Sequence, residues 1–291
     1  MHHSGSTRWE DRVWVGFLGA FPLRTYTSAV RAIAQIPVPR SLRQPVLGTL
    51  AARLGMDLSE AEHSIEEYPS FGDLFVRRLR GGLRPVDADP RLVISPVDGC
   101  ISSFGPLAGD RILQAKGIDY SVAELVGDPE YGDLFADGRY LTIYLRPKDY
   151  HRIHAPFDGE VLSTQRVPGE LFPVQPSVVR TLKGVFVRNE RLAMIFDTPM
   201  GKAALVCVGA TAVGCITTVF GSGPHGAEDG LRRYQPPLKV DKGQEIAAFN
   251  LGSTVILVFQ KGAMEFEPLE ANQELRLGQV VGRSESKVPR S

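Results

Sequence analysis

From about Leu92 onward, the chain consists of short β-branched and aliphatic runs that are separated by glycine and proline. The clearest runs lie at 92–105, 140–147, 192–210 and 253–262. Runs of this length and composition are typical of strands and lack helical periodicity, so they predict a β-rich domain. Hydrophobic residues make up 43% of the 291 residues and charged residues 23%, which is enough apolar material for a substantial core.

A weak internal repeat lies within this β-rich region. Pro-Val-Asp-Gly at 96–99 recurs as Pro-Phe-Asp-Gly at 156–159, and each copy is followed by a strand-like run. An apolar-x-x-Gly-x-x-apolar pattern occurs at 240–246 and again at 275–281. We therefore predict an α+β fold with a catalytic domain like the barrel-sandwich and duplicated-hybrid-motif folds. No Walker A or HExxH motif is present.

The N-terminal segment has a different composition. Between Asp11 and Asp57 there is no acidic residue, whereas six arginines and several aromatic residues are present. This mixture suits a surface in the lipid headgroup region, where arginines meet phosphates and aromatic rings enter the acyl boundary. The run 13–23 is too short to span a bilayer. Residues 1–60 are predicted to be a helical, membrane-associated segment and 61–291 the catalytic domain; the alternative is an amphipathic helical cap.

Prolines are expected to divide this N-terminal segment into short helices, at Pro22, Pro37, Pro39 and Pro45. The following segment, 60–80, has apolar residues at helical spacing and is expected to be helical. Formal net charge is zero, so the bulk electrostatics do not favour a nucleic-acid partner. The three cysteines show no CxxC spacing, which favours a reducing compartment over a disulfide scaffold.

The feature with the clearest chemistry is the Gly252-Ser253 pair at the start of a strand-like run. Glycine allows a strained backbone with an exposed carbonyl, which the hydroxyl of the next residue can attack. Elimination and hydrolysis would then convert Ser253 into a pyruvoyl group. Serine needs a base for this attack, and a third group must orient that base. His151 and His154 are the favoured bases, because they form a pair in a chain with six histidines.

Five stretches make the chain resemble the bacterial type of phosphatidylserine decarboxylase, and they occur in the order of that family. They are SPVDG at 95–99, QAKG at 114–117, DYHRIHAP at 149–156, PGELFPVQP at 168–176 and FNLGSTVILVF at 249–259. The resemblance covers most of the chain from about Phe71 onward, and the basic, apolar N-terminal segment also matches the membrane-associated start of the family.

The resemblance implies a role for each matched residue. Ser253 matches the precursor of the pyruvoyl cofactor, and Gly252 matches the end of the large chain, so cleavage gives chains 1–252 and 253–291. Asp98 and His154 match the residues that activate the serine for self-cleavage, and His151 matches the residue that transfers a proton during decarboxylation. Among the residues themselves, Asp158 competes with Asp98 for the orienting role.

Three further residues are assigned to the substrate. Leu171 and Phe172 lie in the stretch that matches a substrate-side loop, for which a plain β-turn connector is the alternative. Lys116 is placed against the lipid phosphate, with an ordinary solvated lysine as the alternative.

The resemblance also implies the activity and its setting. It implies a self-processed zymogen that decarboxylates phosphatidylserine to phosphatidylethanolamine and CO₂, through a Schiff base with the pyruvoyl group. The expected partners are phosphatidylserine, an anionic membrane surface, the two chains of the protein itself and a second copy in a homodimer. The expected location is peripheral, on the cytoplasmic face of a bacterial inner membrane, as suits phospholipid biosynthesis.

Three alternatives stay open at this point. One is a pyruvoyl decarboxylase that acts on a soluble amino acid, against which the basic, aromatic N-terminal segment argues. Another is a zinc-dependent hydrolase that recruits His151, His154 and Asp98 as ligands, although their spacing is unusual and Ser253 then has no role. The last is a non-catalytic binding module in which the Gly252–Ser253 bond stays intact.

Overall fold

The computed structural model describes residues 23–115, 117–211, 216–221, 230–249 and 253–284. The helices are α2 (Leu23–Ala34), α3 (Arg40–Leu54), α4 (Phe71–Phe75), α5 (Val122–Val126), α6 (Glu130–Leu134), α7 (Pro176–Val179) and α8 (Val185–Arg188), with a 3-10 turn at Ile65–Glu67. The strands are β1 (Leu92–Ile94), β2 (Gly99–Pro106), β3 (Arg111–Ala115), β4 (Ile118–Ser121), β5 (Arg139–Leu145), β6 (Arg152–His154), β7 (Gly159–Val167), β8 (Arg191–Thr198), β9 (Gly201–Val208), β10 (Ile216–Thr218), β11 (Gly230–Val240), β12 (Glu245–Phe249), β13 (Ser253–Phe259), β14 (Met264–Phe266), β15 (Glu274–Leu275) and β16 (Val280–Ser284).

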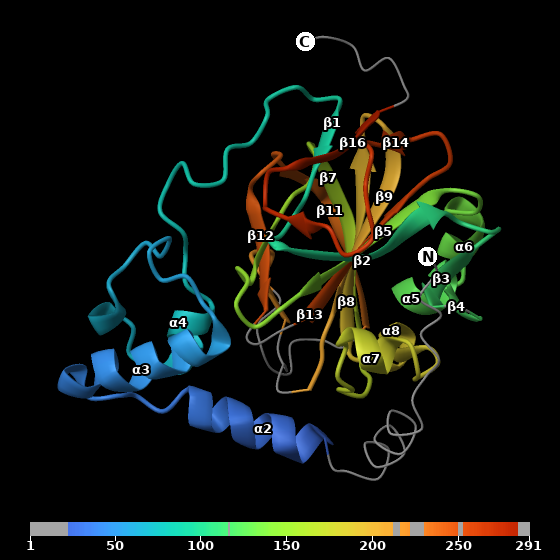
Figure 1. Ribbon diagram of the computed structural model, residues 1–291. Coiled ribbons are helices and arrows are strands. Elements are labelled where there is room, and N and C mark those ends of the chain that lie inside the picture. The colour runs from blue at the N-terminus through green and yellow to red at the C-terminus, as the bar shows by residue number, and fades with distance from the viewer. Residues whose placement is uncertain (1–22, 116, 212–215, 222–229, 250–252, 285–291) are drawn as a thin grey trace, which may run out of the picture.

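An eight-stranded antiparallel sheet in the order β11-β7-β8-β9-β13-β5-β2-β15 is the centre of the fold (Figure 1). Two three-stranded sheets, β1-β16-β14 and β10-β12-β6, and the pair β3-β4 complete the strands. Across the described residues these are open sheets, not a closed barrel. The predicted β-rich α+β class is confirmed at this level. The finer likeness to barrel-sandwich and duplicated-hybrid-motif folds stays a prediction.

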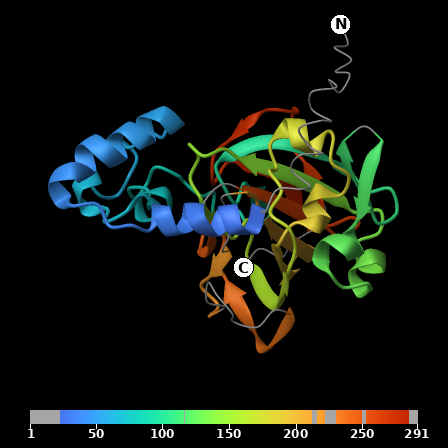
Figure 2. The same ribbon diagram turned by 90° about the horizontal axis from the view of Figure 1, so that it is seen from below.

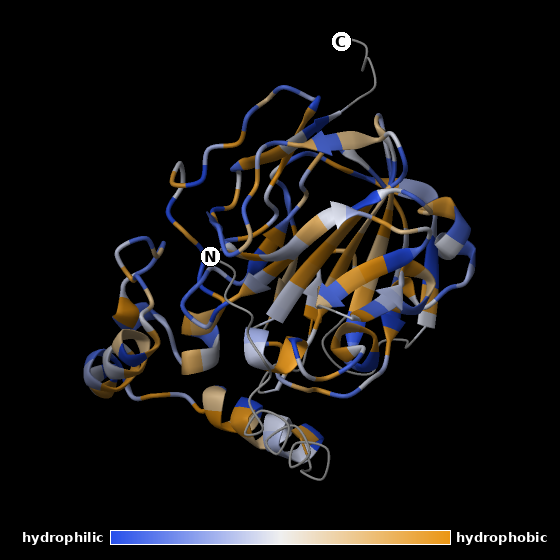
Figure 3. Ribbon diagram, turned by 45° about the vertical axis from the view of Figure 1, so that its right-hand side comes forward, coloured by the Kyte–Doolittle hydropathy of each residue, from blue (hydrophilic) through white to orange (hydrophobic). Residues whose placement is uncertain are grey.

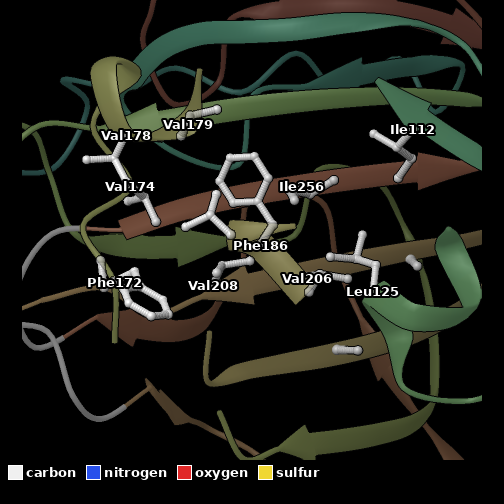
Figure 4. Close-up of a cluster of buried hydrophobic side chains, with 14 of the residues drawn as sticks. Ile112, Leu125, Phe172, Val174, Val178, Val179, Phe186, Val206, Val208 and Ile256 are labelled. Carbon is white, nitrogen blue, oxygen red and sulfur yellow. The ribbon is translucent and has the colours of Figure 1, made fainter. Parts of the chain in front are cut away.

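Strand β13 is buried on both faces, which explains why its sequence STVILVF has no polar alternation. It pairs with β5 on one side and with β9 on the other (Figure 1). Ile256 and Val258 enter a helix-side core, whose members from α5, α7 and α8 are drawn in Figure 4. Val255, Leu257 and Phe259 enter a second core on the opposite face of the sheet. The central strands are accordingly hydrophobic along their length (Figure 3).

The internal repeat is confirmed as two copies of one unit, strand–turn–strand. β1, the turn at 95–98 and β2 form the first copy, and β6, the turn at 155–158 and β7 form the second. Each copy hydrogen-bonds to the turn of the other. The backbone N–H of Ile94 donates to the carbonyl of Pro156 at 3.0 Å, and that of His154 donates to the carbonyl of Pro96 at 2.9 Å.

The two glycine turns of the second repeat pattern bind the two turns of the first in the same way. The Asp98 carboxylate accepts from the Leu277 N–H at 2.7 Å, and the Asp158 carboxylate accepts from the Lys242 N–H at 2.8 Å. Leu277 and Lys242 each immediately precede a glycine of positive φ, at 278 and 243. A side chain at either glycine would be strained there, so these positions of the repeat require glycine.

The N-terminal helices differ from the sequence expectation in two places. Pro45 was expected to break the chain but lies inside α3. It stands just beyond the first turn, so it removes a single intrahelical hydrogen bond, and burial of Leu47 and Ala51 stabilises the helix. The segment 60–80 is helical only in the 3-10 turn Ile65–Glu67 and in α4, because the two ends of the segment fold back on each other through the Ala61–Leu79 bridge.

Helices α2 and α3 lie to one side of the sheets in both views (Figures 1 and 2). Their buried residues, among them Leu23 and Leu47, belong to the helix-side core. Arg24 of α2 also donates to the carbonyl of Gly169 at 2.7 Å, so α2 contacts the start of the 169–176 loop. Within the described part of the chain, no helix is both long and apolar enough to cross a bilayer.

The second core, on the face of the central sheet opposite the helix-side core, contains an aromatic cluster that joins distant parts of the chain. Phe157 packs edge-to-face on Phe196 and Phe259, at centroid distances of 5.4 and 6.1 Å. We expect Phe157→Ala to lower the free energy of unfolding by about 3–5 kcal/mol, because it leaves a cavity at a fully buried site. Denaturant unfolding of the uncleaved Ser253→Ala chain measures this. Leu231→Ala, at a partly exposed position, is the control, and an equal effect of both changes would contradict the assignment.

Candidate active site

Ser253 is the first residue of β13 and lies opposite Leu145, the last residue of β5. Its side chain is 1% exposed, and its Oγ has no hydrogen-bond partner among the described residues. A buried hydroxyl without a partner is costly, and Ser253 shares this state with Thr142, Ser163 and Thr254, but only Ser253 directly follows a glycine. Gly252 lies outside the described residues.

His151 lies in the loop between β5 and β6, at the end of the sheet where Ser253 begins β13. It is fully buried, and its ring packs on Phe75 with centroids 4.1 Å apart. Nδ1 is 2.8 Å from the Asp149 carbonyl, so it carries the proton and donates. Nε2 is therefore a lone-pair acceptor, and it has no partner among the described residues. Burial lowers the pKa of His151 to about 3, which keeps the ring neutral.

His154, at the end of β6, is held differently although it is only three residues away. Its Nδ1 donates to the Gly243 carbonyl at 2.7 Å, and its Nε2 is 3.1 Å from the hydroxyl of Tyr150. The ring is half-buried, and burial lowers its pKa. Because the Gly243 carbonyl requires a proton on Nδ1, Nε2 is the nitrogen that can accept another proton.

Asp98 lies in the turn before β2 and is 9% exposed. Arg84 binds it with a fork, Nη2 to Oδ2 at 2.6 Å and Nε to Oδ1 at 3.0 Å. The Leu277 N–H occupies Oδ1 as well. We expected an aspartate to orient His154 through a hydrogen bond. The structure shows instead that the Gly243 carbonyl sets the tautomer of His154. Asp98 acts on His151 and His154 through its charge, which favours their protonated forms.

The structure bears on the choice between Asp98 and Asp158. The reciprocal pairing of the repeats joins His154 to the carbonyl of Pro96, in the turn that carries Asp98. Asp158, from the second copy, binds the Lys242 N–H instead. These contacts join His154 to the turn of Asp98, and the choice of Asp98 over Asp158 stays a prediction.

The residues assigned to the substrate have different surroundings. Lys116 lies outside the described residues. Leu171 and Phe172 are 6% and 5% exposed, and Phe172 packs in the helix-side core (Figure 4). The backbone of Phe172 is clamped by the buried amide of Asn189, at 3.0 and 2.8 Å. Their contact with substrate stays a prediction.

A charged cavity of about 360 Å³ lies beside residues 148–154, which form the histidine segment. Asp98, Arg84 and Tyr150 line it, together with Arg77 and Asp149. Arg77, Arg84 and Tyr150 were not predicted from the sequence. The signals available were the arginine-rich run FVRRLRGGLRP at 75–85 and the tyrosine directly before His151. Among the described residues, no group of three or more His, Cys, Asp or Glu side chains is arranged to bind a metal ion.

Known proteins resemble this chain over most of its length. The sequence profile of the phosphatidylserine decarboxylase family matches residues 71–283. This chain belongs to the phosphatidylserine decarboxylase family. A phosphatidylserine decarboxylase proenzyme from Anaeromyxobacter sp. (strain K) is 42% identical, covering 94% of this chain and 98% of its own length.

Two other relatives named phosphatidylserine decarboxylase proenzyme are similarly close. The Myxococcus xanthus (strain DK1622) protein is 40% identical, covering 94% of this chain and 98% of its own length. The Halorhodospira halophila (strain DSM 244 / SL1) protein is 43% identical and covers 94% of both chains. The family assignment inferred from the five stretches is thereby confirmed, and the described site residues all lie within the matched region.

The low pKa of His151 predicts an acid-sensitive fold for this decarboxylase family member. Unfolding returns the pKa from about 3 to the ordinary 6.5, so the unfolded chain binds the extra proton. The resulting stabilisation is complete above pH 6.5 and falls by about 1.4 kcal/mol per pH unit below it. In the uncleaved Ser253→Ala chain, we expect His151→Gln to flatten the decline of the melting temperature between pH 6.5 and 4.5.

The matched control for this measurement is His63→Gln in the same chain, because His63 is an exposed histidine. The slope decides, not the absolute melting temperature, because His151→Gln also alters packing. Identical slopes for all three chains would show that His151 is not held neutral by the fold.

Proposed function

We propose that this chain decarboxylates phosphatidylserine to phosphatidylethanolamine and CO₂, with a pyruvoyl group formed from Ser253 by self-cleavage at the Gly252–Ser253 bond. The observation that carries the proposal is the buried, unpartnered Ser253 Oγ at the start of β13. It lies at the same end of the central sheet as His151, whose neutral Nε2 is also unpartnered. The names of the relatives point to the same substrate and to a proenzyme.

Self-cleavage starts with attack of Ser253 Oγ on the Gly252 carbonyl carbon, which moves the acyl group from nitrogen to oxygen. His154 takes the hydroxyl proton, and the low pKa caused by burial keeps its Nε2 unprotonated before the attack. Loss of the Ser253 Cα proton then breaks the ester C–O bond. The products are a carboxylate on Gly252 and a dehydroalanine, whose hydrolysis takes up one water and releases one ammonia.

The residues present suit a pyruvoyl group at position 253. The site is buried, the strand that carries it is held on both sides, and a neutral histidine lies in the loop that follows the neighbouring strand β5. When formed, the group supplies an electron sink for the pair released as CO₂ leaves. His151 takes up a proton on Nε2 as the substrate ammonium gives up its protons to react, and delivers that proton to the former α-carbon. Because burial destabilises its charged form, a proton on Nε2 is donated readily.

Approach to a lipid is supported by the exposed face of α3. Leu42, Val46, Leu50 and Leu54 follow one another at intervals of four residues and are 38–49% exposed. Such an apolar stripe on an arginine-bearing helix suits the headgroup region of an anionic membrane. We therefore place the residues 1–60 segment on the membrane, peripherally and on the cytoplasmic face, with 61–291 as the catalytic domain.

Intact mass of the denatured protein tests the proposed cleavage. We expect the wild type to give two fragments that meet at Gly252/Ser253, with the smaller lighter by one ammonia than a simple hydrolysis product. Ser253→Ala should give one chain without decarboxylase activity, because no hydroxyl is available for the attack. The matched control is Ser163→Ala, which removes another buried, unpartnered hydroxyl on β7 and should cleave normally. An active single-chain wild type would overturn the proposal.

Vesicle binding tests the role of α3. The double change Val46→Asp and Leu50→Asp should weaken binding to anionic vesicles at least about tenfold, because charges replace apolar contacts with the acyl boundary. Co-sedimentation measures this, and intact mass verifies that cleavage is unchanged. The control pair, Leu113→Asp and Val219→Asp, changes side chains that are 52% and 53% exposed elsewhere. Equal binding by both double variants would exclude α3 as a membrane-contacting face.

A further inference from the structure

Arg77 is a buried cation whose charge has no anionic partner. Its residue is 4% exposed, and both Nε and Nη1 lack a hydrogen-bond partner among the described residues. Nη2 donates a long hydrogen bond to the Lys148 carbonyl, at 3.2 Å. Burying a charge without compensation is expensive, so a guanidinium in this state favours an anion beside it.

The other cations that line the same cavity are all engaged by carboxylates. Arg84 is bound to Glu60 and Asp98, Arg146 to Asp149 and Glu274, Arg276 to Glu60, and Lys148 to Glu274. Of the five lining cations, Arg77 therefore stands apart as the one without an ion pair in the described structure. Its Nε and Nη1 nitrogens carry three N–H donors with unused capacity for a new anion.

The position of Arg77 connects it to the proposed catalytic histidine. Three successive residues at the end of α4 contact the histidine segment. Phe75 packs on His151, the Val76 carbonyl accepts from Arg152 Nε at 2.8 Å, and Arg77 donates to the Lys148 carbonyl. Asp149 and Tyr150, the two residues before His151, line the same cavity as Arg77. A ligand that reaches His151 therefore comes within range of Arg77.

We propose that Arg77 binds the phosphodiester of the substrate headgroup, and this rests on the proposed decarboxylation of phosphatidylserine. A guanidinium offers paired donors that match two phosphate oxygens. In phosphoserine headgroups, four bonds separate the reacting amine nitrogen from phosphorus, which suits neighbouring binding positions for the two ends. Arg77 thus holds the headgroup while its amino-acid end reacts.

The headgroup also has a carboxylate, but that group is the poorer partner for Arg77. Its negative charge disappears as CO₂ leaves, so a cation beside it would stabilise the reactant more than the transition state and slow the reaction. The phosphodiester keeps its charge throughout. A cation there contributes equally to substrate and transition-state binding, and its loss should raise KM with little change in kcat.

Steady-state kinetics of Arg77→Gln on phosphatidylserine in mixed micelles tests the assignment. Loss of a charge-assisted contact should lower kcat/KM about 10- to 100-fold, mainly through KM. Arg77→Lys keeps the charge without the fork and should show a smaller loss. Arg80→Gln, at an exposed arginine outside the cavity, is the matched control and should behave like the wild type. A loss confined to kcat would overturn the assignment.

Two soluble inhibitors identify which anion is bound. Glycerophosphoethanolamine has the phosphodiester without the carboxylate, whereas glycerophosphoserine has both. Arg77→Gln should weaken both inhibitors by the same factor; weakening of the serine compound alone would overturn the phosphodiester in favour of the carboxylate.

Intact mass separates the possible failures of this experiment. Complete cleavage of Arg77→Gln is expected, and its absence would move Arg77 to self-cleavage and overturn the binding role. If Arg77→Gln does not fold, the same kinetics on Arg77→Lys decide. A KM of Arg77→Lys equal to that of the wild type would contradict two-point binding of the phosphodiester by the guanidinium. An uncleaved, inactive wild type would instead contradict the proposed function.

Discussion

The reciprocal backbone pairing of the two strand–turn–strand copies is the interaction on which the site depends. The Ile94 N–H binds the turn of the second copy, and the His154 N–H binds the turn of the first. The two turns therefore face each other, each with its own aspartate capped by a backbone N–H from a glycine turn. Symmetry of this kind brings a histidine of one copy to the aspartate turn of the other. The copies then diverge in chemistry, because the position equivalent to His154 in the first copy is Ile94.

The central sheet supplies the second requirement, which is desolvation. β13 divides its side chains between two cores, so its first residue is fixed at the boundary between packed interior and connecting loops. His151 is buried there against Phe75, which comes from the N-terminal half of the chain. The low pKa of the ring follows from this burial, which keeps His151 neutral for its proposed part in proton transfer. Packing and catalysis therefore depend on the same contacts.

Features that short stretches of sequence encode could be predicted from the sequence. Such features are the repeat, the strand-rich body, the histidine pair and the Gly-Ser pair. The structure agrees with the repeat and the fold class, and the family profile agrees with the family. Contacts between distant residues were out of reach. Nothing in a linear reading shows that Arg84 takes both oxygens of Asp98, or that the Gly243 carbonyl fixes His154. Helix-like spacing at 60–80 was likewise overridden by a tertiary contact, the bridge from Ala61 to Leu79.

The ion pairs around the cavity explain how a cleaved chain can keep an intact site. Glu274 and Arg276 lie beyond Ser253, yet they pair with Arg146 and Glu60 from the part before it. The Leu277 N–H, also from beyond the cleavage point, holds Asp98. β13 itself is hydrogen-bonded between two strands of the larger part. Breaking one peptide bond at the start of β13 removes none of these contacts. Because the large part provides the histidines and the small part provides position 253 and the N–H that orients Asp98, the proposed active site exists only while both parts stay associated.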